Sequence, residues 1–442
     1  MIIEQFHDQG LAHLSYAILS QGEIAVIDPC RNPQQYYAFA EKHHAKIIAV
    51  IETHPHADFV SGHGEMSEKG IEIYVSKLTG AKYHHKTFNE GDMLKIGEVT
   101  LIPLDTPGHS PDGISILLKN KDGRNYAIFT GDTLFIGDVG RPDLRESAGN
   151  ATAKKESLAR QLFHSLRDKF ITLEDDVIVY PAHGPGSLCG KSMSTELSGT
   201  IGQQKKENYA LQEMGEEEFV KIILDNQPLI PKYFSYDVDL NISGAPSIEE
   251  GIKNVKIISS MKDAVEETFV IDTRAAKEFR EGHLKGAINL QDGKKFETWL
   301  GSIVAPEERY SIIASDNIQL LNIIEKTTKI GYEMNVGWAI AQSRFDGNPL
   351  DHLDLANFET NTSLYTILDV REKSEVKEGK IFGESINIPL SELRERISEV
   401  PQSKPIVVHC AAGYRSAAAV SILDGKVGNK VYDLSDDIEK FI

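Results

Sequence analysis

Histidine and aspartate side chains recur directly after apolar runs in the N-terminal half of this chain, each time beside glycine or proline. The densest group is Thr53-His54-Pro55-His56-Ala57-Asp58, whose two histidines and aspartate at i, i+2 and i+4 can converge on one point. Three further segments of this kind are centred on His109, Asp132 and His183. Imidazole and carboxylate groups held at the ends of several strands suit a rigid metal site. The pattern therefore predicts a metal site.

A second chemical signal lies near the C-terminus. The apolar run 405–409 ends in Cys410, and Ala411-Ala412-Gly413-Tyr414-Arg415-Ser416 leads into an alanine-rich helical stretch. A thiol between a strand end and a helix start faces backbone N–H groups and the positive end of the helix. Arg415 adds a full positive charge, and both effects stabilise a thiolate or an anionic persulfide. We expect Cys410 and Arg415 to be catalytic, and Gly413, Tyr414 and Ser416 to belong to the substrate cradle.

The other cysteines are Cys30 and Cys189, so the set is odd and sparse. Such a set is no disulfide framework and favours a reducing compartment. Cys189 lies six residues after His183. It either lines the metal cavity and binds substrate, with Lys191 lowering its pKa, or is a small buried apolar residue. Cys30 has less to support a role.

Composition narrows the partners. The chain has 442 residues and a net charge of 47 − 66 = −19. An acidic surface disfavours nucleic acid and anionic membranes as partners, but a local pocket can still bind a small anion. The first residues do not resemble a signal peptide, and no apolar run approaches the ~20 residues that span a bilayer. We expect a cytoplasmic protein.

The elements that must position these residues are short strands and helices. Strands are expected at 24–27, 47–52, 100–104, 127–130 and 177–180, with helices at 33–43 and 153–166 between some of them. This mixture predicts a layered α/β domain. A polar helical stretch is expected over 202–224, and Gln227-Pro228-Leu229-Ile230-Pro231 ends any helix there.

An internal repeat follows. Phe269-Val270-Ile271-Asp272-Thr273-Arg274 precedes two glycines and Ile288-Asn289-Leu290, and Thr366-Ile367-Leu368-Asp369-Val370-Arg371 precedes two glycines and Ile386-Asn387-Ile388. The shared order of strand, Asp-x-Arg, short helix and second strand predicts two homologous domains. Residues 343–349 are expected to link them.

The segments Thr53–Asp58, Thr106-Pro107-Gly108-His109 and Thr130-Gly131-Asp132 together resemble the metallo-β-lactamase superfamily. Glyoxalase II-like hydrolases of that superfamily have a further histidine directly after the motif aspartate, which helps to hold a second metal. This chain has Phe59 there, so it is more similar to the persulfide dioxygenases, which use one iron. That resemblance implies His54, His109 and Asp132 as ligands of Fe(II).

The same resemblance implies that His56, Asp58 and His183 lie next to the ligands without binding the iron. These three residues would orient the ligands, hold water or bind a weak second metal. The segment Gly137-Asp138-Val139-Gly140-Arg141-Pro142-Asp143 resembles a segment of the same dioxygenases. Arg141 either binds an anionic group of the substrate or forms an ion pair with Asp138 or Asp143.

The last domain resembles rhodanese through Cys410-x-x-Gly413-x-Arg415-Ser416 and its upstream Asp-x-Arg. Cysteine-dependent phosphatases place five residues between cysteine and arginine, whereas four stand here, which favours sulfur over a phosphoryl group. The middle repeat has Ser315-Asp316-Asn317 after its strand, with neither thiol nor arginine. We expect it to be a degenerate rhodanese domain with a structural or docking role.

The chain is thus expected to be α/β, with a metallo-β-lactamase αββα sandwich in residues 1–240, a degenerate rhodanese-like domain in 245–345 and a catalytic rhodanese domain in 352–442. Both rhodanese domains should have parallel sheets. The resemblance implies a persulfide dioxygenase fused to a sulfurtransferase. It would convert a low-molecular-weight persulfide and O2 to sulfite, and then form thiosulfate at Cys410.

Two other functions stay open: a zinc-dependent thioesterase similar to glyoxalase II, and a sulfur-relay module in which Cys410 passes persulfide to a partner protein. The sequence leaves the thiol carrier open between glutathione, coenzyme A and other bacterial thiols. A homo-oligomer, dimer or tetramer, is the expected assembly.

Overall fold

The computed structural model describes residues 1–146, 154–265 and 269–442. The chain forms two compact units. The first comprises Met1–Glu250 with Thr328–Gly331, and the second comprises Gly251–Thr327 with Tyr332–Ile442. Within the described residues, no helix is both long enough and apolar enough to pass through a bilayer.

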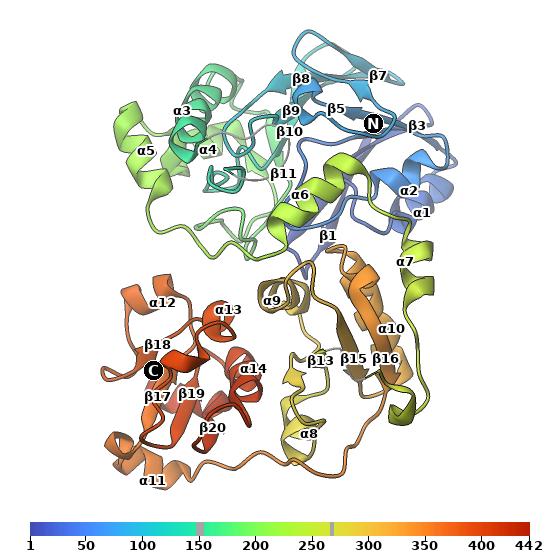
Figure 1. The fold of residues 1–442 in the computed structure, drawn as a ribbon. Helices are drawn as coiled ribbons and strands as arrows, with labels where there is room; N and C mark the ends of the chain where they lie inside the picture. The colour runs from blue at the N-terminus through green and yellow to red at the C-terminus, as the bar shows by residue number, and fades with distance from the viewer. Residues whose placement is uncertain (147–153, 266–268) are drawn as a thin grey trace. The chain divides into compact units, whose positions relative to one another are not determined.

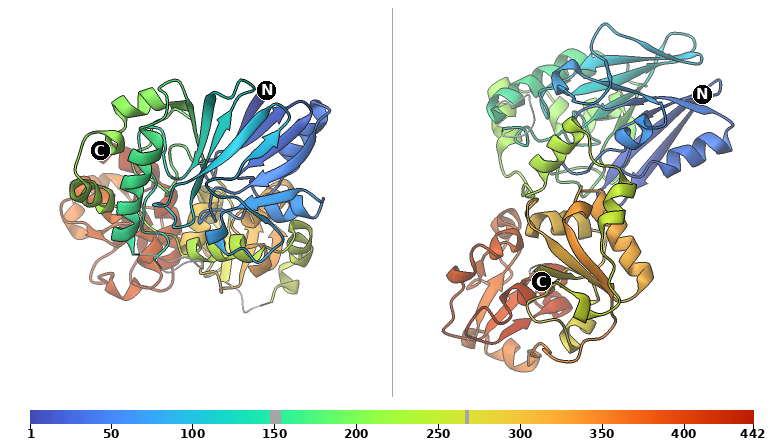
Figure 2. Two further views of the ribbon diagram at one scale, coloured as in Figure 1. Left: turned by 90° about the horizontal axis from the view of Figure 1, so that it is seen from above. Right: turned by 45° about the vertical axis from the view of Figure 1, so that its right-hand side comes forward.

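Two six-stranded sheets form the centre of the first unit (Figures 1 and 2). The first has the order β1-β2-β3-β4-β5-β6, with β1 Ile2–Asp8, β2 His13–Ser20, β3 Glu23–Ile27, β4 Lys46–Ile51, β5 Glu72–Val75 and β6 Lys86–Thr87. The second has the order β12-β11-β10-β9-β8-β7, with β7 Leu94–Ile96, β8 Val99–Asp105, β9 Ile114–Lys119, β10 Asn125–Gly131, β11 Ile178–Pro181 and β12 Gly199–Thr200. All five strands expected from the sequence are present to within two residues at each end.

Alternating side chains along the strands give each sheet two apolar faces. In β10, Ala127 and Phe129 pack into the core between the two sheets, whereas Ile128 packs into a separate core on the outer face. This alternation follows from the two-residue period of a strand. The buried core between the sheets contains residues of both, including Ile27 and Ile51 of the first and Leu101 and Ile116 of the second.

Helices cover both outer faces (Figure 1). On the first sheet, α1 (Gln34–Lys42) and α2 (His63–Ser67) bury Tyr36, Phe39 and Met66. On the second sheet, α3 (Lys155–Ser165) and α5 (Glu216–Leu224) bury Leu162 and Phe219. The predicted αββα sandwich of the metallo-β-lactamase type is therefore confirmed. Helix α6 (Phe234–Ser243) also belongs to this unit, and Ala153, where a helix was expected to begin, lies outside the described residues.

The continuous helical stretch expected over 202–224 is wrong. The structure has α4 (Ile201–Glu207), a 3-10 turn at Tyr209–Leu211 and then α5. Asn208 breaks the helix, because its side chain accepts a hydrogen bond from the Ala210 N–H and donates to the Phe135 and Asp138 carbonyls. An asparagine that bonds to nearby backbone competes with helix formation, and this partnership depends on the tertiary fold.

The second unit contains two four-stranded sheets whose strand pairs are all parallel. The first has the order β14-β13-β15-β16, with β13 Phe269–Asp272, β14 Ile288–Asn289, β15 Tyr310–Ala314 and β16 Val336–Ala341. The second has the order β18-β17-β19-β20, with β17 Thr366–Asp369, β18 Ile386–Asn387, β19 Ile406–His409 and β20 Val431–Asp433. The helices of this half of the chain are α7 Ile248–Asn254, α8 Ala276–Glu281, α9 Phe296–Ile303, α10 Asn317–Thr328, α11 Leu355–Thr360, α12 Lys373–Glu378, α13 Leu390–Leu393 and α14 Tyr414–Leu423.

The predicted repeat is reproduced in side-chain contacts as well as in topology. Arg274 forms a buried ion pair with Asp272 and also donates to the Gly282 carbonyl. In the second copy Arg371 pairs with Asp369, and donates to the Gly379 carbonyl. The asparagines of β14 and β18 each donate to the backbone carbonyls of the aspartate and of the arginine of this motif. The Asp-x-Arg motif therefore makes equivalent structural contacts in the two sheets.

Candidate functional site

The predicted metal-binding residues lie on loops that leave one strand of the first sheet and three strands of the second. The segment with His54 follows β4, and His109, Asp132 and His183 follow β8, β10 and β11. The turn after β10 requires Gly131, which has a φ of 52°, and a Cβ atom there would lie 2.5 Å from Thr53 Oγ1. A side chain in this left-handed conformation is disfavoured. The close approach brings the His54 and Asp132 loops together.

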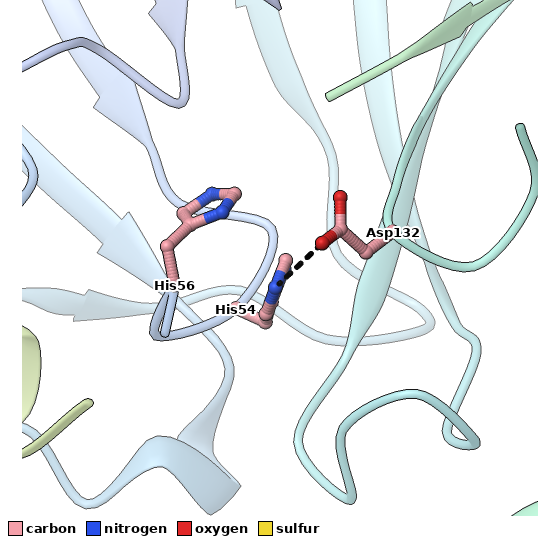
Figure 3. A group of neighbouring side chains, drawn as sticks. All are labelled: His54, His56 and Asp132. Carbon is pink, nitrogen blue, oxygen red and sulfur yellow. Dashed lines mark ion pairs between the residues drawn. The ribbon is translucent and has the colours of Figure 1, made fainter. Parts of the chain in front are cut away.

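Two histidine nitrogens face one carboxylate oxygen at the centre of the site. His54 Nε2 lies 3.7 Å from Asp132 Oδ2, and His109 Nε2 lies 3.5 Å from the same oxygen. Figure 3 shows His54 and His56 directed toward Asp132 and marks the His54 contact. All these side chains are buried. Among the described residues, neither His54 Nε2 nor Asp132 Oδ2 has a hydrogen-bond partner.

The protonation state of both histidines follows from their Nδ1 atoms. His109 Nδ1 donates to the Arg141 carbonyl at 2.8 Å. Thr53 uses its hydroxyl hydrogen on Asp28, so it accepts from His54 Nδ1 at 3.0 Å. Burial lowers the pKa of His109 and, with His56 adding to the effect, lowers the pKa of His54 well below its usual value. Both rings are neutral, and each Nε2 directs a lone pair at the Asp132 carboxylate.

The two Nε2 atoms and Asp132 Oδ2 thus face one another as hydrogen-bond acceptors. Their lone pairs repel one another unless a cation lies between them. These donors fit a metal ion, and neutral imidazole with carboxylate is a common ligand set. The hydrogen bonds at Nδ1 are the partners that fix ligand orientation at metal sites.

His183 holds two carboxylates. Its Nδ1 donates to Asp132 Oδ1 at 2.8 Å, and its Nε2 lies 2.8 Å from Asp58 Oδ2. Burial opposes the charged ring, but Asp132 and Asp58 outweigh it and raise the pKa of His183 well above its usual value. Burial likewise opposes ionisation of Asp132, and His183 overcomes it, so the pKa of Asp132 is well below its usual value. The Nδ1 atom is thus occupied by a hydrogen bond, whereas Nε2 makes an ion-pair contact with Asp58 but no hydrogen bond among the described residues.

The loop that contains Cys410 joins β19 to α14, as predicted. Cys410 is buried, whereas Ala411 and Ala412 at the tip of the loop are exposed. Gly413 has a φ of 85° and immediately precedes α14. Arg415 donates from both Nη atoms to Glu375, at 2.5 and 2.9 Å. Its guanidinium charge is therefore shared between the loop and this carboxylate, a partner that the sequence analysis did not assign.

The corresponding loop of the middle domain is closed by its own side chains. Gln319 Oε1 accepts from the Ser315 N–H at 2.7 Å, and Asp316 Oδ1 accepts from the Gln319 N–H. The Ser315 hydroxyl donates to Glu278, which occupies the position equivalent to Glu375 in the repeat. The loop thus has neither nucleophile nor an open cradle, in line with the expected loss of catalysis there.

Comparison with known proteins agrees with this architecture. The model of the metallo-beta-lactamase superfamily matches residues 8–183, and the model of the rhodanese-like domain matches residues 255–332 and 354–442. This chain combines a metallo-β-lactamase domain with two rhodanese-like domains. The crystal structure of a metallo-beta-lactamase from Staphylococcus aureus is 29% identical, covers 77% of this chain and 99% of its own, and has a TM-score of 0.69.

Curated relatives match the metallo-β-lactamase domain. Cytoplasmic hydroxyacylglutathione hydrolase of Arabidopsis thaliana is 34% identical over 38% of this chain and 62% of its own length. Mitochondrial persulfide dioxygenase ETHE1 of Mus musculus is 30% identical over 44% of this chain and 66% of its own length. The chain therefore spans just under two thirds of these two relatives. They differ in activity, so side chains of the site must discriminate between them.

Phe59 stands directly after Asp58, where the resemblance to glyoxalase II-like hydrolases leads one to expect a further histidine. It is buried, with its ring 4.4 Å from His56 and 3.9 Å from His13 between centroids. His56, Asp58 and His183 have ligand atoms within 4.8 Å of one another. An apolar ring beside this trio supplies no ligand. His63, the next histidine along the chain, lies 3.3 Å from Glu52.

Arg141 is occupied by protein groups. Its Nε and Nη2 atoms donate to Asp143 at 2.7 Å each, and Nη1 donates to the Leu188 and Leu229 carbonyls. Of the two roles considered for Arg141, this geometry matches the ion pair with Asp143. Binding of an anionic substrate group would require that pair to open.

Cys189 lies beside the metal site, as one interpretation of the sequence held. Its Sγ atom is within 4.8 Å of ligand atoms of His109 and Asp132. The expected effect of Lys191 is wrong, because burial raises the pKa of Cys189 well above its usual value. The Lys191 ammonium donates instead to the Ile222 and Asp225 carbonyls. A neutral thiol therefore borders the metal site.

Two residues near the site were not singled out from the sequence. His13 begins β2 and is buried against Phe59, and Arg145 forms an ion pair with buried Asp112 at 3.0 Å beside the His109 loop. An isolated histidine at a strand start and an arginine after a Gly-Arg segment carry no periodic signal. Only the fold brings them to the site.

Proposed function

We propose that the metallo-β-lactamase domain is a one-iron persulfide dioxygenase and that the last rhodanese domain transfers sulfur to its product. The observation that carries the proposal is the convergence of His54 Nε2 and His109 Nε2 on Asp132 Oδ2, where neither His54 Nε2 nor Asp132 Oδ2 has a hydrogen-bond partner among the described residues. Two histidines and one carboxylate leave positions open, the arrangement typical of non-haem Fe(II) enzymes that activate oxygen. Iron bound there would supply O2 activation.

The protein side chains prepare this site for an iron. The Arg141 carbonyl and Thr53 hydroxyl hold the two imidazoles with Nε2 directed inward, and His183 holds Asp132 ionised. Such partners preserve ligand geometry and basicity. Because His183 Nε2 lies at ion-pair distance from Asp58 and Phe59 contributes no ligand, His56, Asp58 and His183 lack the further histidine ligand that a second metal uses in the hydrolases.

The proposed overall oxidation balances as R–S–SH + O2 + H2O giving R–SH and sulfurous acid, which ionises to sulfite. The outer sulfur of the persulfide is oxidised and O2 is reduced. The substrate class is a low-molecular-weight thiol persulfide. The relative from Mus musculus is named a persulfide dioxygenase, which supports this class.

At Cys410 the proposed reaction is a sulfur transfer without net oxidation. The Cys410 thiolate attacks the outer sulfur of a second persulfide, the S–S bond of the donor breaks, and the donor leaves as a thiol. Sulfite then attacks the outer sulfur on Cys410, so that thiosulfate forms and the Cys410 thiolate is released. The helix α14 N-terminus and Arg415 favour the anionic forms of this residue.

A zinc-dependent thioesterase is the second candidate. It is favoured by the 34% identity to a hydroxyacylglutathione hydrolase and by the proximity of His56, Asp58 and His183. Two zinc ions per chain would require His183 Nε2 to bind a metal in place of its ion-pair contact with Asp58.

One experiment separates the two candidates. Protein loaded anaerobically with iron, and separately with zinc, is assayed for O2 uptake with glutathione persulfide and for hydrolysis of a glutathione thioester. We expect uptake only with iron, and its loss in His109→Ala. Thioester hydrolysis by the zinc protein without O2 uptake by the iron protein would favour the hydrolase.

A further inference from the structure

The middle rhodanese domain contacts the catalytic loop of the last domain. Tyr414, directly after Gly413, donates its hydroxyl to the Gln291 carbonyl at 2.8 Å. The Tyr414 ring also lies against Gly293, where a Cβ atom would be 3.4 Å from Cε2. Both partners belong to the segment that links β14 to α9 in the middle domain. A residue of the catalytic loop is therefore held by the domain without a thiol.

Arg415 has a middle-domain neighbour as well. Its guanidinium carbon lies 5.7 Å from the centre of the Trp299 ring, which belongs to α9. Such a distance is within the range of a cation–π contact. Glu375 engages the Nη atoms from the arginine's own domain. The guanidinium is thus positioned by a carboxylate of one domain and an aromatic ring of the other.

The two domains are joined by further polar contacts within the same compact unit. Arg394 donates to both carboxylate oxygens of Glu308 at 2.8 Å and to the Ile303 carbonyl at 2.6 Å. Ser421 of α14 accepts from the Asn289 N–H at 2.8 Å. A bidentate arginine–carboxylate pair fixes orientation as well as distance. These contacts hold α9 in a defined place relative to α13 and α14.

From these contacts we infer that the middle domain contributes to the Cys410 site. Its Trp299 positions the Arg415 guanidinium to bind an anionic sulfur acceptor. This inference rests on the proposed sulfur transfer at Cys410. A guanidinium has five N–H donors, and those not used by Glu375 are available to an incoming anion. The Arg415 side chain beside the ring is only 14% exposed, and the field of a charge is stronger where little water surrounds it. Trp299 is a positioning residue, because it acts through Arg415.

The chemical step is the second half of the transfer. The sulfite sulfur attacks the outer sulfur on Cys410, the new S–S bond of thiosulfate forms, and the Cys410 thiolate leaves with the electron pair of the broken bond. Sulfite is an anion, so its approach depends on where the guanidinium lies. Dithiothreitol attacks as a thiolate that carries a single charge, so its approach depends less on the guanidinium than the approach of the sulfite dianion does.

The test compares two acceptors on full-length protein loaded with sulfur from glutathione persulfide. For Trp299→Leu, we expect kcat/KM for sulfite to fall about two- to fivefold, as the loss of a partly exposed cation–π contact predicts, while kcat/KM for dithiothreitol stays at the wild-type value. Trp299→Phe should recover most of the sulfite rate, because the ring is kept. Trp338→Phe is the matched control, since that side chain is buried in the core of the same domain.

An equal loss with both acceptors, or no loss with sulfite, would overturn the inference. Tyr414→Phe keeps the ring and removes only the hydrogen bond to the Gln291 carbonyl. It therefore serves as a second test if Trp299→Leu does not fold. We expect a selective loss with sulfite there too, and an unselective loss would count against the inference. Failure of wild-type protein to transfer sulfur to either acceptor would instead refute the proposed function.

Discussion

The imidazole of His183 donates a hydrogen bond from Nδ1 to Asp132 Oδ1 at 2.8 Å, which leaves the other oxygen of that carboxylate facing His54 and His109. The single carboxylate thus has one oxygen committed to the protein and one available to a metal.

His183→Gln should weaken iron binding about 10- to 100-fold, the usual cost of losing a partner that orients a ligand. Glutamine cannot contact both carboxylates as a charged ring does. Competition with a chromogenic iron chelator measures the affinity. His164→Gln is the control, because His164 is exposed. Unaltered affinity in His183→Gln would contradict the role of this hydrogen bond.

Phe59→His should create a ligand beside His56 and Asp58 and raise the zinc content from about one toward two ions per chain, since a fuller ligand set favours a second ion. Metal analysis after dialysis against zinc measures the change, with Phe59→Leu as the apolar control. If the wild-type protein already binds two zinc ions firmly, Phe59 is not what excludes the second metal.

Cys410→Ser should change the product from thiosulfate to sulfite while O2 uptake continues, because the hydroxyl cannot carry sulfane sulfur and the metal ligands are on other loops. Product chromatography with glutathione persulfide as substrate measures both anions. Cys30→Ser provides the control for loss of a thiol. Thiosulfate formation at the wild-type rate in Cys410→Ser would remove this residue from the scheme.

Glu372, at the start of α12, makes the stability of its domain depend on pH. Burial raises the pKa of Glu372 to about 7 from the usual 4.5, although Arg415 opposes the shift. Between those values the folded chain retains a proton that the unfolded chain has released, so stability falls as pH rises and is lowest above pH 7. Because the side chain is partly exposed, we expect a loss of about 1–2 kcal/mol.

Urea unfolding of wild-type protein and Glu372→Gln between pH 5 and 8 measures this effect. The variant should lose the pH-dependent part and be relatively more stable at the alkaline end, whereas the exposed Glu378→Gln should follow the wild type. A larger advantage of Glu372→Gln at the acid end would reverse the sign and reject the explanation.

The ligand-bearing segments were predictable because each carries its own local signal. Thr53–Asp58 follows an apolar strand, and Cys410 stands between a strand and a helix. The sequence therefore showed that these candidate residues lie at strand ends. The Asp-x-Arg repeat likewise predicted two homologous domains, because Asp272 and Asp369 close equivalent strands.

The partners of these residues were not predictable, because they depend on contacts between distant segments. Asp143 engages Arg141, Glu375 engages Arg415, and Lys191 turns away from Cys189 toward the Ile222 and Asp225 carbonyls. The sequence also did not reveal that Tyr414 and Arg415 contact the middle domain. Contacts between side chains of distant segments leave no periodic pattern in a single sequence.

The most direct test of the account is the ratio of O2 consumed to sulfite formed by iron-loaded Cys410→Ser protein with glutathione persulfide. The variant keeps the metal site and blocks the consumption of sulfite, so the oxygenase step is measured alone. The account predicts equal molar amounts of O2 and sulfite, and no uptake when His109→Ala is added. Release of glutathione without O2 consumption would contradict the oxygenase and leave a hydrolytic metal site.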